Sequence, residues 1–216
     1  MADRVKRRRP YRSTVRAEQA QRTRARIVEA ARALFLKRGF AATTIATVAE
    51  AAAVAPETVY ATFRSKAGLL EAVVLAAVLR DDEPDEPLER RWVREALALP
   101  DTRAQLAALA RHTAETVALT SPVYAVMRAA GTGVSELEQL QQRLQDYRFG
   151  GQAQFIAKIA DGRSLRPGVS VEEAAATFSA LASPELHHIL TVGRGWSQEH
   201  YARWLERTAV AALLAD

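Results

Sequence analysis

The sequence predicts an all-α fold, with an N-terminal three-helix helix-turn-helix domain followed by a C-terminal helical domain. Within residues 22–70, apolar side chains recur at three- and four-residue steps, which is the spacing of amphipathic helices. Beyond residue 80, further helical patterns follow, and we see no credible strand run. Between the two regions, residues 81–87 combine five acids with two prolines, which is typical of a domain boundary.

The first predicted helix has one apolar side and ends at a glycine. Gly39 stands at the usual stop position, where a left-handed backbone conformation closes a helix. The apolar side consists of Ile27, Ala30, Ala31, Leu34 and Phe35.

Two shorter helices follow, joined by a turn at residues 51–54. Thr44 can cap the first of them, whose inward side is Ile45, Val48 and Ala49. Pro56 occupies the first position of the next helix, where its fixed φ suits a helix start. On this helix Val59 and Phe63, four residues apart, face inward. A fourth helix then opens at Lys66, behind Ser65.

The inward pair leaves Glu57, Tyr60 and Ala61 pointing outward, with Thr58 and Thr62 beside them. A short exposed helix behind a tight turn can lie in the major groove of duplex DNA, which is wide enough to admit an α-helix. The pattern therefore favours a protein that reads DNA.

These residues resemble the TetR family of ligand-responsive transcriptional regulators, over about the first third of the chain. The matched elements, in family order, are Arg26-Ile27-Val28, Ala30-Ala31, Phe35, Gly39, Thr43-Thr44, Val48-Ala49, Val54, Val59-Tyr60, Phe63, Ser65-Lys66 and Leu69-Leu70. The stretches SLRPGVSVEEAA and SPELHHILTVGRGWS also resemble the C-terminal regulatory domain of an actinobacterial group of the family. The resemblance implies a homodimer that binds a palindromic operator as a repressor and is released by a small effector.

Two residues depart from the family pattern. Ala53 replaces the glycine usual in the turn, and Ala55 replaces the small hydroxyl residue that normally caps the recognition helix. Loss of a cap costs roughly 0.5 to 2 kcal/mol. Pro56 compensates in part by presetting its backbone angle.

Charge divides along the chain in the way a DNA-binding protein requires. Residues 1–79 hold 15 Lys and Arg against 6 Asp and Glu, a balance of +9, whereas residues 80–216 hold 15 against 19, a balance of −4. The chain has no cysteine, so it offers no disulfide and no thiolate metal site. Its longest apolar run, residues 72–79, is far short of the ~20 residues that span a bilayer. We expect a cytoplasmic protein without a membrane partner or a cofactor.

Residues 1–20 form a basic leader that we expect to be a flexible, disordered arm, because apolar periodicity is almost absent. Its arginines can neutralise phosphates or enter a narrow minor groove. A solvated tail that only improves solubility is the alternative. The candidate contacts are Arg7, Arg8, Arg9 and Arg12.

We predict a DNA-binding domain at residues 21–68. Within it, the position and length of each side chain indicate which part of the DNA it can contact. Thr44 and the amides beside it can hold one phosphate, Lys66 another, and Tyr60 a third unless it is a core residue. Glu57 can accept a hydrogen bond from a cytosine amino group, although a carboxylate in the first turn also favours the helix dipole. The predicted base-reading residues are Pro56, Glu57, Thr58, Ala61 and Thr62.

Residues 69–216 are predicted to form a helical ligand-binding and dimerisation domain. The predicted helices cover residues 88–99, 101–119, 122–130, 135–160, one from Ser170, and one from about Ser197 to Leu214. Capping boxes are expected at Ser135-x-x-Glu138 and Ser170-x-x-Glu173, and Gly150-Gly151 suggests a kink or a close approach, or only neutral packing.

The last two long helices carry alanine-rich faces suited to close packing. The resemblance implies that they pair with their mates in a four-helix dimer interface, which we favour, and packing within the core of one subunit is the alternative. These faces comprise Val171, Ala174, Ala175, Phe178 and Leu181, with Tyr201, Leu205, Thr208, Ala212, Leu213 and Leu214. By the resemblance, an apolar effector is expected in a cavity among these helices, although any single aromatic is more often a core residue than a pocket residue. The candidate ligand-binding residues are Trp92, His112, Thr116, Tyr124, Met127, Phe149, Gln152 and Phe155.

An enzyme and a nonspecific architectural nucleic-acid-binding protein are the alternative functions. Glu185-x-x-His188 resembles half of a di-iron helix site, but no second such pair occurs in the sequence. Catalytic triads, phosphate loops and dinucleotide fingerprints are also missing from the sequence. We therefore expect no catalytic or metal-binding residues.

Overall fold

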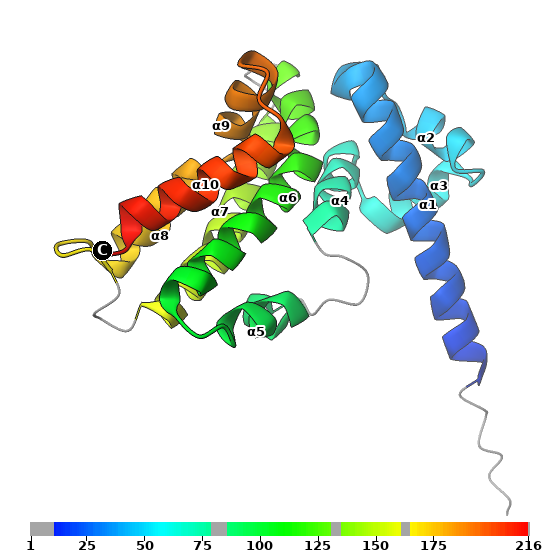
Figure 1. Ribbon diagram of the computed structural model, residues 1–216. Coiled ribbons are helices and arrows are strands. Elements are labelled where there is room, and N and C mark those ends of the chain that lie inside the picture. The colour runs from blue at the N-terminus through cyan, green and yellow to red at the C-terminus, as the bar shows by residue number, and fades with distance from the viewer. Residues whose placement is uncertain (1–10, 79–85, 131–134, 161–164, 216) are drawn as a thin grey trace, which may run out of the picture.

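The computed structural model describes residues 11–78, 86–130, 135–160 and 165–215, and those ranges are helical apart from short connections (Figure 1). Side chains of residues 11–15 and 17 are outside the description. A 3-10 turn η1 (Pro87–Glu89) precedes α5, and a π-helical turn η2 (Ile189–Gly193) follows α9. In chain order the helices are α1 Tyr11–Ala42, α2 Ile45–Ala51, α3 Pro56–Phe63, α4 Lys66–Val78, α5 Arg91–Leu97, α6 Thr102–Ala129, α7 Ser135–Ile159, α8 Val171–Leu181, α9 Pro184–His188 and α10 Gln198–Leu213.

Helix α4 lies between α1 and α6 and connects the two halves of the molecule (Figure 1). On one side α2 and α3 pack beside the C-terminal half of α1, while the N-terminal half of α1 extends away from the body of the protein. On the other side α6 packs against α10, and α7 packs against α8. The helix-turn-helix therefore lies at one end of the molecule, with α4 behind it.

Helix α1 is longer than expected. We predicted disorder through residue 20, but α1 begins at Tyr11, so that prediction is wrong for residues 11–20. Glu, Gln, Ala and Arg dominate this stretch, and their high helix propensity extends the helix without an apolar face. Arg7, Arg8 and Arg9 lie outside the described residues. The predicted stop at Gly39 is confirmed, because its φ of 76° and ψ of 175° interrupt the helix.

Two apolar cores fill the molecule, and the first of them crosses the expected domain boundary. The first core joins α1 to α4 with the end of α6, at Val123 and Met127, and the start of α7, at Leu137 and Leu140. The second core joins α5, the start of α6, the end of α7, α8 and α10. A division at residues 68 and 69 remains a prediction, and α4 packs on both sides of it.

Helix α6 is a single helix, so the predicted break between residues 119 and 122 is wrong. Pro122 lies inside α6 on its exposed side, where the missing N–H removes one backbone hydrogen bond. The next residues, Val123 and Tyr124, are buried in the first core, whereas Leu106 and Leu109 lie in the second. Because the helix is anchored in both cores, packing carries it through the proline.

The alanine-rich faces of α8 and α10 belong mainly to the core of this subunit. Ala174, Phe178, Tyr201 and Leu205 are fully buried within the chain. We had favoured these faces as a dimer interface, and the structure corrects that assignment, because side chains already packed against α6 and α7 cannot also face a partner. Of that set, Val171 is 39% exposed.

Side-chain caps begin several of the C-terminal helices. Ser170 Oγ accepts from the Glu173 amide at 3.1 Å, which confirms the predicted start of α8. Ser197 Oγ accepts from the His200 amide at 3.2 Å at the start of α10. Helix α7 begins at Ser135 itself, and the residue before it lies outside the described ranges. At Gly151 an added Cβ would meet Pro87 at 3.6 Å, an ordinary contact, so neutral packing describes this glycine pair best.

Candidate nucleic-acid interface and ligand cavity

Helix α2 begins with a reciprocal cap. Thr44 Oγ1 accepts from the Thr47 amide at 3.1 Å, and Thr47 Oγ1 accepts from the Thr44 amide at 3.2 Å. The predicted cap at Thr44 is confirmed, whereas Thr47 was missed because a threonine replaces the usual Glu or Gln of a capping box. Thr44 is exposed at the N-terminus of α2, where a helix presents positive dipole to an anion.

Helix α3 presents the outward face that the sequence predicts. Val59 and Phe63 are buried at 0% and 6% exposure, and Tyr60 is 55% exposed. Tyr60 is therefore a surface residue and not part of the core. The side chains around it are small and uncharged, except for the carboxylate of Glu57. The other members of this face are Pro56, Glu57, Ala61 and Thr62, all exposed, and Thr58, which is half-buried.

Both ends of α3 lack favourable local chemistry. Ala55 is the N-cap and makes no side-chain cap hydrogen bond, as expected from its methyl side chain. The turn before it places Ala53 at a φ of +50°, and the C-cap Arg64 has a φ of +66°. Left-handed conformations cost L-residues roughly 1–2 kcal/mol each. Packing must therefore hold this helix in place.

Lys66 is bound within the protein. Its Nζ donates to the carbonyl oxygen of Phe40 at 2.8 Å and lies 4.2 Å from the centre of the Phe40 ring. Burial lowers the pKa of Lys66, and Glu136 opposes that effect by raising it. The ammonium thus joins the end of α1 to the start of α4. To bind a phosphate as well, it would donate one of its two remaining N–H groups.

Close packing joins α3 to α4. The Ser65 hydroxyl accepts from the Gly68 amide at 3.0 Å, which sets the first turn of α4. A Cβ added at Gly68 would overlap the carbonyl oxygen of Phe63. Only glycine allows this close an approach between the first turn of α4 and the end of α3.

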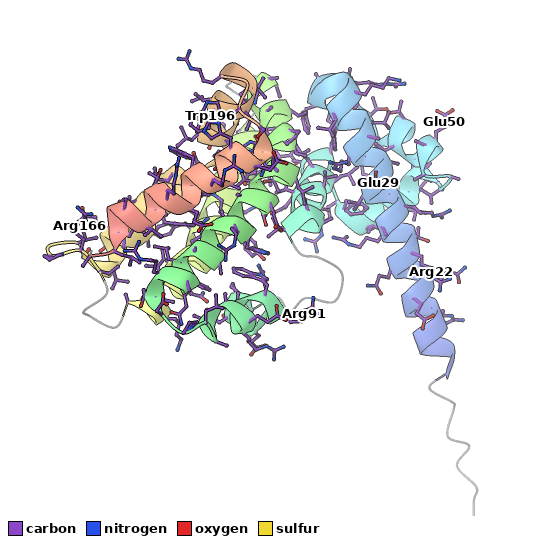
Figure 2. All side chains as sticks on the ribbon, in the orientation of Figure 1. Arg22, Glu29, Glu50, Arg91, Arg166 and Trp196 are labelled. Carbon is purple, nitrogen blue, oxygen red and sulfur yellow. The ribbon has the colours of Figure 1, made fainter. Side chains whose placement is uncertain are left out.

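The helical leader carries exposed basic side chains beyond the four arginines predicted to contact DNA. Arg16, Arg22, Arg24 and Arg26 are exposed on α1, and Figure 2 shows Arg22 on the part of α1 that projects from the body. The Arg24 guanidinium lies 4.8 Å from the centre of the Phe63 ring on α3. These cations therefore lie on the helix-turn-helix side of the molecule. The side chain of Arg12 is outside the description.

A cavity of about 100 Å³ lies between α4, α5, α6 and α7. Five of the eight predicted ligand-binding residues line it: Trp92, His112, Tyr124, Gln152 and Phe155. The sequence analysis missed several polar or cationic lining residues, because nothing in the local pattern shows which helix faces meet. They are Arg90, Thr113, Thr120, Tyr147 and Arg148.

Three predicted ligand-binding residues lie away from this cavity. Thr116 is one helical turn beyond His112 and donates to its carbonyl oxygen at 3.0 Å. Met127 is buried in the first core. Phe149 is 37% exposed and borders a separate surface groove between α7 and α8. These three residues do not line the cavity, and their predicted contact with an effector stays a prediction.

Stacked rings form one wall of the cavity. The Trp92 ring lies 3.7 Å from the His112 ring at an interplanar angle of 12°, and 5.9 Å from the Phe155 ring at 13°. Flat apolar walls of this kind suit planar or aliphatic organic ligands.

Polar groups lie along the rest of the cavity. Arg90 donates to the Tyr147 hydroxyl at 2.6 Å, and Arg148 donates to the Gln152 side-chain oxygen at 3.4 Å. Burial raises the pKa of Tyr124 to about 12, so its hydroxyl keeps its proton and can donate to a ligand. Burial also lowers the pKa of Arg148.

Neither a metal cluster nor a membrane span is found in the ranges the structure describes. Groups of three or more His, Asp or Glu side chains able to hold a metal ion are absent from those ranges. Across the same residues, each helix is too short or too polar to cross a bilayer.

Sequence comparisons identify the helix-turn-helix. Residues 27–73 match the model of the bacterial regulatory proteins of the tetR family. The regulator TtgR of Pseudomonas putida is 49% identical over 57 residues, and the repressor BdcR of Escherichia coli is 40% identical over 67 residues. The matched stretch covers 26% of this chain in both cases, and only 27% of TtgR and 34% of BdcR.

Solved structures match the fold over nearly the whole chain. NalD of Pseudomonas aeruginosa, the secondary repressor of the MexAB-OprM multidrug efflux pump, is 21% identical with a TM-score of 0.68, over 91% of this chain and 99% of NalD. A regulator of Saccharomonospora viridis, solved with choline, is 22% identical with a TM-score of 0.66, over 91% and 100%. An actinobacterial type of C-terminal domain remains a prediction. Residues 27–73 therefore match the tetR family in sequence, and the chain as a whole shares the fold of solved transcriptional regulators such as NalD.

Proposed function

We propose that this protein is a ligand-responsive transcriptional repressor, which acts in the bacterial cytoplasm as a homodimer on a palindromic operator. The observation that carries the proposal is the face of α3: Tyr60 and the small residues around it are exposed, while Val59 and Phe63 anchor the helix from behind. A helix held in this way can enter a major groove without losing its own packing. Cations on α1 and at the N-terminus supply attraction for phosphates.

Direct readout would come from the exposed face of α3. Glu57 accepts from a cytosine amino group, and the methyl groups of Ala61 and Thr62 contact thymine methyls. Tyr60 and the N-terminus of α2 at Thr44 hold phosphates. Lys66 contributes less to phosphate binding than its sequence position suggested, because its ammonium is bonded to Phe40.

The short length of the recognition helix α3 supports a homodimer. A single helix of eight residues reads only a few base pairs, so two copies one helical turn apart supply affinity and specificity. The outer sides of α8 and α10 remain available for pairing, and their exposed apolar residues include the large Val171 and the small Ala176, Ala180 and Ala211. Sedimentation at micromolar concentration should give a dimer, and a strict monomer would contradict the proposal.

Coupling between effector and DNA would run through α4. Val74, Leu75 and Val78 of α4 line the cavity, while the first turn of the same helix touches α3 at Gly68. An effector that binds one position of α4 more tightly shifts the spacing of the two recognition helices and weakens operator binding.

DNA-binding measurements test the function. Fluorescence anisotropy should compare the DNA upstream of the protein's own gene with random duplex and with RNA, all at physiological salt. We expect a preference of at least ~10³ for an inverted repeat in the upstream DNA. Equal affinity for all three would instead support a nonspecific architectural protein, which the exposed arginines of α1 alone could serve.

A further inference from the structure

Arg148 is a partly buried cation between the cavity and the groove of α7 and α8, and within the described residues no carboxylate forms an ion pair with it. Its Nη1 donates to the carbonyl oxygen of Ser179 at 2.8 Å and to the side-chain oxygen of Gln152 at 3.4 Å, and both acceptors are neutral. Within the described ranges, the ion pairs of Arg91, Arg111, Arg128 and Arg143 all lie elsewhere. Charges withdrawn from water are normally paired, so a partly buried guanidinium at a cavity wall, without an ion pair of its own, can accept a ligand that supplies the counter-ion.

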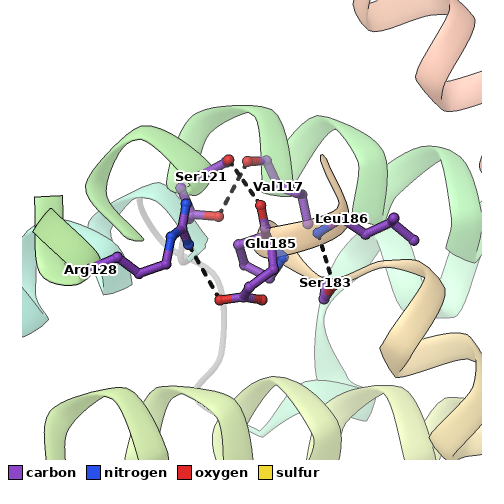
Figure 3. A network of polar contacts seen from close by, with 8 residues as sticks. Val117, Ser121, Arg128, Ser183, Glu185 and Leu186 are labelled. Carbon is purple, nitrogen blue, oxygen red and sulfur yellow. Dashed lines mark hydrogen bonds and ion pairs between the residues drawn. The ribbon is translucent and has the colours of Figure 1, made fainter. Parts of the chain in front are cut away.

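The nearest acid, Glu185, is already engaged by another arginine. Glu185 Oε1 pairs with Arg128 Nη1 at 3.4 Å, as Figure 3 shows. The same part of α9 is fixed on α6 by the Ser121 hydroxyl, which donates to the carbonyl oxygen of Pro184 at 3.2 Å. Glu185 therefore acts on Arg148 only at longer range, where its charge raises the Arg148 pKa against the lowering by burial, while the hydrogen bonds of Arg148 go to neutral groups.

The cavity beside Arg148 is positive and, at one end, aromatic. Its described lining contains two arginines and one histidine, and no Asp or Glu. On α7, Gln152 and Phe155 follow Arg148 by four and seven residues, and all three line the cavity. At about 1.5 Å per residue, the Phe155 end lies ~10 Å along the helix from the guanidinium.

We propose that the effector is an organic anion, an arylalkanoic carboxylate, whose head group binds Arg148 and whose ring packs against Trp92 and Phe155. The assignment rests on the proposed function, since it names the ligand of the same cavity. A planar guanidinium holds a carboxylate through two parallel hydrogen bonds. Gln152 and Tyr124 can donate to the same head group.

Three ligands with one carbon skeleton test the head group directly. Isothermal titration calorimetry of the wild-type protein, without DNA, should compare 4-phenylbutyrate, 4-phenylbutanol and 4-phenylbutylammonium. We expect the carboxylate to bind at least tenfold more tightly than the alcohol, and the ammonium to bind most weakly. Equal affinities, tighter binding of the ammonium, or no binding of the carboxylate at millimolar concentration would overturn the proposal.

Variants on α7 test whether Arg148 binds the carboxylate. Arg148→Met should weaken 4-phenylbutyrate binding at least tenfold and change 4-phenylbutanol binding less than threefold, while Arg148→Lys should retain part of the preference for the anion. Lys158→Met, which removes an exposed cation from the same helix, should leave all three affinities unchanged. An unchanged affinity of Arg148→Met for the carboxylate would overturn the assignment. If Arg148→Met fails to fold, the wild-type ligand series decides alone.

The proposed anion site and the proposed repressor function can be refuted independently of each other. Binding of 4-phenylbutyrate to a protein that ignores every duplex would support the anion site and refute the repressor. Specific operator binding that only the alcohol or the ammonium releases would support the repressor and overturn the anion site.

Discussion

The two short helices of the helix-turn-helix are stabilised in opposite ways. Helix α2 begins at the reciprocal cap of Thr44 and Thr47, so its first turn is held by its own residues. Helix α3 begins at the uncapped Ala55, behind the left-handed Ala53, and ends at the left-handed Arg64. Local chemistry favours α2 and disfavours α3, although both helices form.

Packing explains why α3 forms. Two residues with positive φ and one missing cap together cost about 2.5–6 kcal/mol. Burial of Phe63 alone contributes a comparable amount, since truncation of a buried phenylalanine costs about 3–5 kcal/mol. Val59 and the close contact at Gly68 add to it. A recognition helix held from behind leaves its outer face free to vary with the DNA that it reads.

The largest expected effect comes from removing that anchor. Phe63→Ala should lower the free energy of unfolding by about 3–5 kcal/mol, because it empties a buried site against α1 and α4. Urea denaturation measures the change. Tyr60→Ala, at a position that is 55% exposed, is the control: it should alter stability by only about 0.5 kcal/mol while weakening operator binding. A cost below about 1 kcal/mol for Phe63→Ala would show that packing does not hold α3.

Removing the cap of α2 should have the next largest effect. Thr44→Ala removes the hydroxyl that accepts from the Thr47 amide, leaves the Thr44 amide bonded to Thr47 Oγ1, and should cost about 1 kcal/mol in urea denaturation. Thr44→Ser keeps the hydroxyl and should stay close to wild type. If both variants unfolded at the same urea concentration, the cap would not be what stabilises α2.

Relieving the strained turn should increase stability. Ala53→Gly should gain about 0.5–1 kcal/mol, since glycine adopts a positive φ without steric cost but loses more chain entropy on folding. Thermal unfolding followed by circular dichroism detects the change. Ala46→Gly, at an exposed helical position of α2, should instead lose about 1 kcal/mol. A loss at both positions would mean that Ala53 is not strained.

Adding the missing cap should have the smallest effect. Ala55→Ser places a hydroxyl where the first amides of α3 point and should gain about 0.5 kcal/mol, a modest amount because Pro56 already orders the helix start. The same thermal measurement applies, with Ala55→Val as the variant that adds bulk but no acceptor. An equal gain from valine would assign the effect to packing.

The sequence predicted the first core better than the cavity. Ile27, Phe35, Val48 and Val59 recur at helical spacing, and all four are buried as expected. In the C-terminal half the same spacing located the helices but misassigned their faces, as Phe178 shows: it was expected at a dimer interface and lies in the subunit core. Helical periodicity identifies an apolar side without identifying what covers it.

By itself, the sequence determined the helix-turn-helix, the Gly39 stop and the caps at Thr44 and Ser170, because these depend on residues within about four positions of one another. Tertiary structure decided the continuity of α6 through Pro122 and the chemistry of the cavity. Arg90 and Tyr147, 57 residues apart, meet at 2.6 Å only because α5 and α7 enclose the same space. Contacts of that range depend on how several helices pack together, and no local pattern encodes them.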